Sequence, residues 1–246
     1  MRRRQLYIET RIRADLEDVW QATQDPSRHQ RWDLRFGRIE YLTPRDGRQA
    51  FRYATLGISG VGVSTGNRHG PGGGRTSALR FGSRHPLSPI RAGSGYWRYL
   101  PVADGVRFLT SYDYRPRVLP GWAMWWATAW SFDRLRLWLE TGRTPERSLR
   151  QALAEAGARA ASALLAAALL PPLPATAVLA AALALPPLPG TPAARRCLHR
   201  PPERDRRPMG APCPRSSSAR SAASSPASTP SSSAGSASGS TAAKPA

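Results

Sequence analysis

The best candidates for acid/base chemistry are a tyrosine and an aspartate that follow each other near the end of a strand-like stretch. The hydroxyl of Tyr112 could donate a hydrogen bond to a carbonyl or enolate oxygen, and Asp113 could act as a base. Neighbouring residues on a strand point to opposite faces, so these two side chains cannot serve one pocket. The spacing argues against a catalytic dyad and leaves Tyr112 as a hydrogen-bonding candidate.

A second candidate is the stretch that contains Trp32, Asp33 and Arg35. One interpretation is a core tryptophan followed by an ion pair on the surface. The other places these residues at the mouth of an apolar pocket, where a few polar groups orient a ligand. The sequence leaves both interpretations open.

Motifs for cofactors and metals are not supported. Gly60-Val61-Gly62 lies between two strand-like stretches, with no helix after it to receive a dinucleotide phosphate. Cys197 and His199, together with Cys213, have an irregular spacing for zinc. We therefore expect no nucleotide cofactor and no metal, and no catalytic residue can be assigned.

The pattern of apolar residues indicates which elements carry the candidates. Residues 7–14 alternate as a half-buried strand, Asp15 can cap a helix, and Pro26 can start a second short helix that ends near Trp32. Turn residues then separate strands at 35–42, 49–55, 61–68, 75–81, 91–102 and 106–114. Asp104-Gly105 is the strongest hairpin signal. Strands joined by short turns predict a mostly antiparallel sheet.

A long helix is predicted from Gly121 to Glu140, a stretch that holds five of the eight tryptophans of the chain. It would be about 30 Å long. One stripe contains Met124, Thr128, Phe132, Leu135 and Leu139, and we expect a curved sheet to close around it. The opposite stripe, with Trp122, Trp126 and Trp130, is either packed or meets something apolar. Four charged residues within the stretch argue against a membrane span.

The order of elements, with these residues, resembles a known family. YIETRIRADLEDVWQATQDPSRHQRWDLRF, residues 7–36, is similar to the opening of the START-like, polyketide cyclase/dehydrase superfamily with the Bet v 1-like, helix-grip fold. Its specific pieces are Val19-Trp20, Trp32-Asp33, the block SGYWRYLPVADGVRFLTSYDY and the start of the long helix. The resemblance covers about Gln5 to Thr141.

The resemblance implies an α+β fold in which a seven-stranded, mostly antiparallel curved sheet wraps around the long C-terminal helix, with two short helices after the first strand. It also implies a cavity between sheet and helix that holds a lipid, a sterol, a polyketide or another apolar molecule, and some members catalyse cyclisation. On this basis we expect ligand contacts from Trp32, Arg35, Tyr96, Trp97, Tyr99, Phe108, Tyr112, Met124, Thr128, Phe132 and Leu135.

The formal net charge of +20 favours anionic partners, such as a membrane surface or nucleic acid. Lys244 is the only lysine, and Ala, Gly, Pro and Arg are abundant, which is typical of a GC-rich coding sequence. The arginines are dispersed, so we expect no specific nucleic-acid partner. Two cysteines exclude a disulfide framework, and no secretory signal is evident, which suits a cytoplasmic protein.

The composition divides the chain into three parts. We expect residues 1–146 to form the helix-grip domain, residues 147–190 to form helical pieces rich in Ala, Leu and Pro, and residues 191–246 to be a disordered basic, then Ser/Ala/Pro-rich tail. The apolar runs 160–170 and 175–185 are each about 16 Å long as helices, shorter than a membrane span. This middle part is interpreted as either membrane-associated or degenerate. Three hypotheses remain: binding of a small hydrophobic ligand, a cyclase/dehydrase-type enzyme, and a peripheral module on an anionic membrane.

Overall fold

The computed structural model describes residues 4–44, 48–55, 57–117 and 120–202. The strands are β1 (Arg4–Ile12), β2 (Arg38–Tyr41), β3 (Ala50–Thr55), β4 (Ile58–His69), β5 (Arg75–Gly82), β6 (Ile90–Val102) and β7 (Gly105–Pro116). The α-helices are α1 (Leu16–Gln24), α2 (Pro26–Trp32), α3 (Gly121–Thr141), α4 (Pro145–Leu169) and α5 (Pro172–Ala184). The predicted disorder of residues 203–246 lies outside the described residues.

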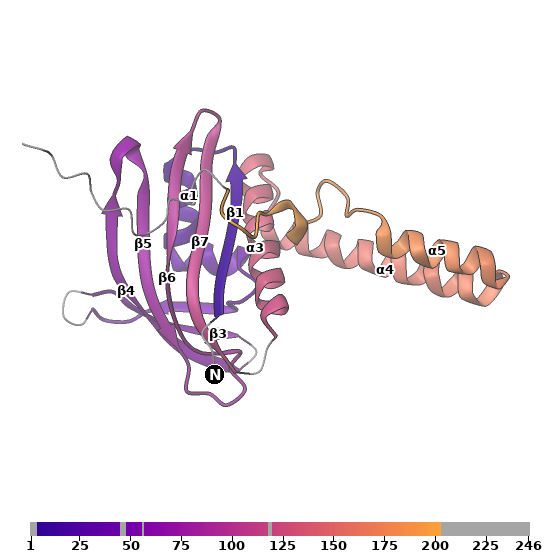
Figure 1. Ribbon diagram of the computed structural model, residues 1–246, viewed down its shortest axis with the longest axis horizontal. Helices are drawn as coiled ribbons and strands as arrows, with labels where there is room; N and C mark the ends of the chain where they lie inside the picture. The colour runs from indigo at the N-terminus through magenta and orange to yellow at the C-terminus, as the bar shows by residue number, and fades with distance from the viewer. Residues whose placement is uncertain (1–3, 45–47, 56, 118–119, 203–246) are drawn as a thin grey trace, which may run out of the picture. The chain divides into compact units, whose positions relative to one another are not determined.

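The seven strands form one antiparallel sheet in the order β1-β7-β6-β5-β4-β3-β2 (Figure 1). Strands β6 and β7 pair up to Val102 opposite Gly105. Gly105 has a φ of 137°, and a Cβ atom there would lie 2.1 Å from the carbonyl oxygen of Ile12. The turn therefore requires glycine, and the hairpin predicted at Asp104-Gly105 is confirmed.

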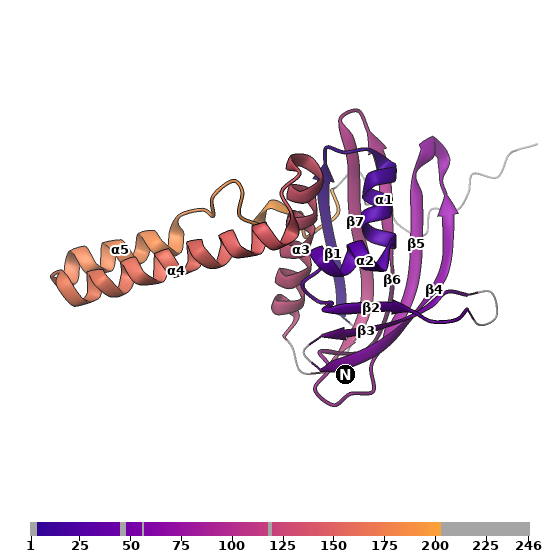
Figure 2. The same cartoon turned by 180° about the vertical axis from the view of Figure 1, so that it is seen from behind.

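Helices α1 and α2 lie over one face of the bent sheet (Figure 2). Pro26 occupies the first turn of α2, and Asp25 caps it by accepting a hydrogen bond from the Ser27 amide at 2.8 Å. The indole of Trp32 donates to the Ala22 carbonyl at 2.9 Å, which joins α2 to α1. The two short helices predicted after the first strand are confirmed.

Helix α3 supplies the other half of the core. Its predicted apolar stripe is buried except for the partly buried Leu139, and Phe132 stacks on Phe108 of β7 with ring centroids 4.5 Å apart. The helix ends at Gly142, whose φ of 67° is the left-handed conformation that closes many helices. The α+β helix-grip fold expected from the sequence is therefore present.

The opposite side of α3 is not a uniform tryptophan stripe. The side chains of Trp122 and Trp126 are 72% and 46% exposed, but Trp130 is buried, and so is Asp133 farther along the helix. The Arg134 guanidinium lies over the Trp130 ring, 5.6 Å from its centroid, and the C-terminal segment that follows α5 covers Asp133. This burial explains why α3 lacks a simple polar face.

Residues 191–202, expected to be part of a disordered tail, instead pack on α3 and β1. The buried Asp133 carboxylate accepts hydrogen bonds from the Ala193 amide at 2.8 Å and from the Arg196 guanidinium at 2.9 Å. Leu198 exchanges two backbone hydrogen bonds with Glu9 of β1. The expectation of disorder was wrong here because the partners of this segment lie far away in the sequence.

Replacing Asp133 with alanine is expected to release the C-terminal segment. Limited trypsin digestion should then cleave after Arg195 and Arg196 at least about tenfold faster than in the parent, because local opening controls proteolysis. The matched control is Asp104→Ala, since Asp104 pairs with Arg11 on the surface. Equal cleavage rates in both variants would show that Asp133 does not hold the segment.

Helices α4 and α5, which lie between α3 and the C-terminal segment in the sequence, form an antiparallel hairpin that projects away from the sheet (Figure 1). Thr144 caps α4, and Arg31 of α2 pairs with Glu146 at 2.9 Å, so the first turn of α4 is joined to the domain. Among the described residues, α4 is the one helix long and apolar enough by composition to cross a membrane.

Candidate ligand-binding site

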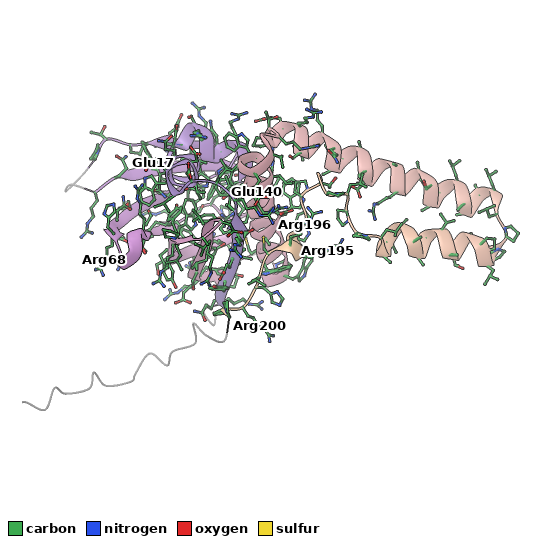
Figure 3. The ribbon with its side chains drawn as sticks, turned by 90° about the horizontal axis from the view of Figure 1, so that it is seen from above. Glu17, Arg68, Glu140, Arg195, Arg196 and Arg200 are labelled. Carbon is green, nitrogen blue, oxygen red and sulfur yellow. The ribbon has the colours of Figure 1, made fainter. Side chains whose placement is uncertain are left out.

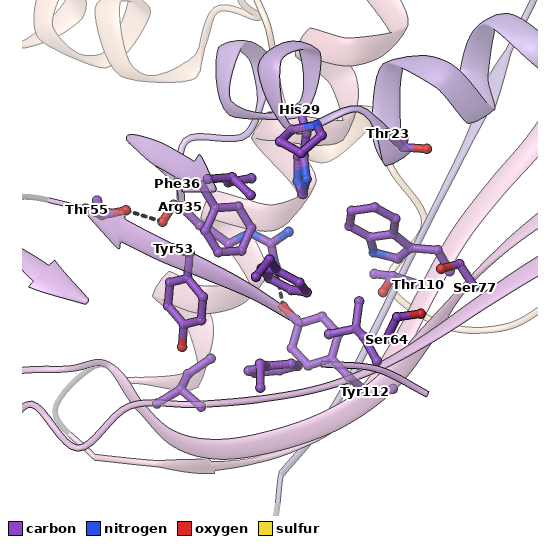
Figure 4. Close-up of a pocket in the computed structure, with 18 of the residues that line it drawn as sticks. Thr23, His29, Arg35, Phe36, Tyr53, Thr55, Ser64, Ser77, Thr110 and Tyr112 are labelled. Carbon is purple, nitrogen blue, oxygen red and sulfur yellow. Dashed lines mark hydrogen bonds between the residues drawn. The ribbon is translucent and has the colours of Figure 1, made fainter. Parts of the chain in front are cut away.

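A cavity of about 680 Å³ lies between the sheet, helices α1 and α2, and the first turns of α3 (Figure 4). This volume lies in the range of ligand pockets, about 300–1,000 Å³. Most of the lining is aromatic or aliphatic, and includes Trp20, Phe36, Ile39, Phe51, Tyr53, Leu79, Phe81, Ile90, Trp97 and Met124. The space fits an apolar molecule.

Two glycines of β4 make room for the aromatic wall. A Cβ atom at Gly62 would lie 2.1 Å from the ring of Phe51, and one at Gly60 would lie 2.3 Å from the ring of Tyr53. The rings of β3 therefore lie directly over the β4 backbone. The Gly-Val-Gly sequence has a packing role in a strand, in keeping with the rejection of a dinucleotide loop.

A buried ion pair stands at one side of the cavity. The Arg35 guanidinium donates to both carboxylate oxygens of Asp33, at 2.9 Å and 2.6 Å. The Arg35 amide also donates to Asp33, at 3.0 Å, and the His29 imidazole is 3.2 Å from it. The sequence left open a surface ion pair, but the Asp33 side chain has no exposed area.

Burial and charge fix the protonation states of this cluster. Burial alone would raise the pKa of Asp33, but the charge and hydrogen bonds of Arg35 lower it well below its usual value. Burial lowers the pKa of His29, and its hydrogen bond to Asp33 offsets only part of that effect, so the imidazole is neutral at pH 7. Because Asp33 accepts, His29 carries its proton on Nε2.

The hydrogen bonds of Tyr112 define what its hydroxyl can do. It accepts from Arg35 at 2.8 Å and lies 3.2 Å from the hydroxyl of Thr128. Thr128 donates its own proton to the Met124 carbonyl at 2.7 Å, so Tyr112 must donate to Thr128. The phenolic proton therefore points away from the ligand space, and Asp113 is exposed on the other face. This arrangement favours a positioning group over a general acid.

The structure brings five of the eleven predicted contact residues to the cavity: Arg35, Tyr96, Trp97, Tyr112 and Met124. The other six do not line it: Trp32, Tyr99, Phe108, Thr128, Phe132 and Leu135. They form the solid core beneath the cavity, where the rings of Trp32, Phe108 and Phe132 fill the space between sheet and helix. The cavity is displaced toward α1 and α2, because only the start of α3 reaches it.

Two tyrosines of β6 lie on opposite faces of the sheet, because successive side chains alternate along a strand. Tyr96 is among the residues that line the cavity, but its ring lies on the opposite face of β6 from that of Trp97 and packs against the Arg98 guanidinium at 5.3 Å. Its side chain therefore does not point into the ligand space. Tyr99 is fully buried and bonds to Thr23 at 2.7 Å and Gln24 at 2.9 Å. It joins α1 to the sheet.

Several lining residues were missed from the sequence, among them His29, Phe36, Phe51, Tyr53 and Phe81. A usable signal existed in the paired glycines of β4, which leave space for rings on the neighbouring strand. Ser64 also lines the cavity, within Gly62-Val63-Ser64-Thr65-Gly66. This stretch matches the G-x-S-x-G nucleophile pattern, which was overlooked, but it lies inside β4 and not at a strand-to-helix turn.

With this geometry in view, the family can be assigned. Residues 3–136 match the sequence pattern of the family described as polyketide cyclase / dehydrase and lipid transport. The chain belongs to this family. The match covers more than half of the chain and contains every strand of the sheet and most of α3.

A curated relative is an uncharacterized membrane protein, YndG, of Bacillus subtilis. It is 42% identical over 170 residues, which are 62% of this chain and 63% of the relative, so this chain matches less than two thirds of its length.

The chain is also similar to several solved structures, at low sequence identity. A STAR-related lipid transfer protein from Xanthomonas axonopodis is 22% identical, with 48% of this chain and 73% of the other covered and a TM-score of 0.36. The Zhui aromatase/cyclase from Streptomyces sp. R1128 is 17% identical, with 48% and 72% covered and a TM-score of 0.36. Protein CV1439 from Chromobacterium violaceum is 15% identical, with 55% and 96% covered and a TM-score of 0.42.

Proposed function

We propose that this polyketide cyclase/dehydrase family member binds one small, predominantly apolar molecule in the cavity between the sheet, α1–α2 and the start of α3. The observation that carries the proposal is the cavity itself, about 680 Å³ of space walled by rings and aliphatic side chains. Such a surface gains free energy when an apolar ligand displaces its water.

The charge state of the wall favours a neutral ligand. Arg35 is the cation at the cavity, and Asp33 already neutralises it through two side-chain hydrogen bonds. A carboxylate ligand would have to compete with Asp33 for the guanidinium, and its negative charge would lie near the buried negative charge of Asp33. An uncharged molecule with one hydrogen-bond donor, able to use the remaining lone pair of Tyr112, meets no such cost.

The proposal is tested with the full chain and a neutral fluorescent probe, N-phenyl-1-naphthylamine. We expect saturable binding, displaced by neutral apolar competitors more effectively than by fatty-acid anions of similar size. Native mass spectrometry of the purified protein should also detect a small apolar molecule carried by the chain. Probe fluorescence that rises without saturation, together with no bound mass, would contradict the proposal.

Filling the cavity from β4 is expected to weaken probe binding. Ser64 lines the cavity, so Ser64→Trp places an indole in the ligand space, and the probe dissociation constant should rise at least about tenfold, or about 1.4 kcal/mol. The control is Val61→Trp on the same strand, since Val61 is 46% exposed on the outer face. Equal affinities in the two variants would place the probe elsewhere on the protein.

A further inference from the structure

The distal part of the α4–α5 hairpin exposes leucines without a single charge. No Asp, Glu, Lys or Arg occurs between Arg159 and Arg195. Residues 160–185, called the apolar tip from here on, expose Leu164 by 71%, Leu169 by 76% and Leu173 by 83%. Helix α5 has no buried residue. A surface of this kind requires an apolar cover.

The turn of the apolar tip lacks the backbone donors that would need water. A helix leaves four N–H groups without intrahelical partners at its start. In α5 these positions are Pro171, Pro172, Leu173 and Pro174, and the three prolines have no N–H. The next amide, that of Ala175, already donates to the Pro171 carbonyl at 3.1 Å. Only the Leu173 donor remains, which lowers the cost of placing this end in hydrocarbon.

The two hydroxyl side chains of the apolar tip are also satisfied internally. Ser162 donates to the Ala158 carbonyl at 2.9 Å, and Thr176 donates to the Leu173 carbonyl at 2.8 Å. Each bond lies within one helix. The side chains of the tip therefore add no polar group that loses a hydrogen bond when water is removed.

Charge returns abruptly at the base of the hairpin. Arg159 of α4 donates to the carbonyl oxygens of Ala182, Leu185 and Pro186 at the end of α5, at 2.7–2.9 Å, and pairs with Glu155. Between residues 143 and 159 there are four arginines and two glutamates. Arg195 and Arg196 follow where the chain returns to α3 (Figure 3). These arginines at the domain end of the hairpin suit anionic lipid headgroups.

The length of the apolar tip selects one leaflet. From Ala160 to Leu169, α4 rises about 15 Å, half of a hydrocarbon core of about 30 Å. The whole of α4 is long and apolar enough by composition to cross, but a span would place Glu155 and Arg159 in the hydrocarbon, which is costly. We propose that the α4–α5 hairpin inserts its apolar tip into one leaflet of a lipid bilayer, turns near the midplane at Pro171, and holds the ligand-binding domain at the membrane surface.

The proposal is independent of the ligand and is tested by flotation of the full chain with vesicles of 70% phosphatidylcholine and 30% phosphatidylglycerol. We expect the chain to float with the vesicles and to remain bound in 1 M NaCl, because apolar insertion is not screened by salt. Leu164→Asp should reduce the floated fraction at least about tenfold. The control is Leu153→Asp, on the same helix at the charged base and 64% exposed, which should float like the parent.

Other covers for the apolar tip give different results. If a second copy of the chain covers it, the protein sediments as a dimer without lipid, Leu164→Asp makes it monomeric, and no flotation occurs, which would overturn the proposal. Depth is measured with Leu170→Cys in a Cys213→Ser background and a membrane-impermeant maleimide. We expect no labelling of residue 170 from outside or from the vesicle lumen, whereas labelling from the lumen would show a full span and would overturn insertion into one leaflet.

Discussion

Replacing Asp33 with alanine is expected to destabilise the domain by about 3–5 kcal/mol, because it leaves the Arg35 guanidinium buried without a countercharge. The Asp33 side chain is completely buried and receives four hydrogen bonds from Arg35 and His29. Such a loss is large beside a typical folding free energy of about 5–15 kcal/mol. Equilibrium unfolding in urea, followed by tryptophan fluorescence, measures it.

A second variant separates charge from packing. Asp33→Ala combined with Arg35→Met removes both charges, and we expect this chain to be more stable than Asp33→Ala alone. A double variant as unstable as the single variant would show that lost packing, and not the bare guanidinium, causes the effect.

The pH dependence of the same pair has a defined sign. The pKa of Asp33 in the folded state lies below its ordinary value of 3.8, since the effect of Arg35 outweighs that of burial. The stability from this group is therefore complete above about pH 4 and is lost as the pH falls below that value. Asp33→Ala should lack this part of the acid sensitivity. An acid unfolding profile with the same slope in parent and variant would contradict the assignment.

Replacing Phe132 with alanine is expected to cost about 3–5 kcal/mol of stability and to leave probe affinity nearly unchanged. Its side chain is completely buried and packs between Phe108, with centroids 4.5 Å apart, and Trp32, at 6.1 Å. Urea unfolding gives the stability, and probe titration at low denaturant gives the affinity.

The matched control on the same helix is Trp122→Ala, because that ring is 72% exposed and its removal should change stability by no more than about 0.5 kcal/mol. If Phe132→Ala is as stable as the control and binds the probe more tightly, Phe132 lines the ligand space after all. That result would restore the location predicted from the sequence.

The strands and α3 could be predicted because their signals are local. Alternation, the Asp104-Gly105 turn and the stop at Gly142 each lie within a few residues of the element that they define. Which rings line a cavity is not local. Phe132 and Met124 belong to one stripe, yet only Met124 reaches open space, since Phe108 and Trp32 fill the volume above Phe132.

The ion pair and the C-terminal segment show the same limit. The sequence indicated that Asp33 and Arg35 matter, but their burial depends on β7, which supplies Tyr112 to the guanidinium. The segment around Arg196 was predicted to be disordered from its composition, since nothing nearby reveals the Asp133 carboxylate that it meets. Long-range pairing of buried charges leaves little trace in one sequence.

The attachment of Leu198 to β1 has a consequence for where the folding unit ends. Its two backbone hydrogen bonds to Glu9 cover part of the free edge of the sheet, and the Cys197 thiol donates to the Ala129 carbonyl. A fragment that stops after α3 would therefore leave an open β edge, and the buried Asp133 would keep its bond to Arg136 but lose those to Ala193 and Arg196. Both changes promote aggregation. The folding unit is therefore discontinuous, with a long insertion whose two ends lie close together, because a Cβ atom at Gly190 would lie 2.9 Å from the guanidinium carbon of Arg143.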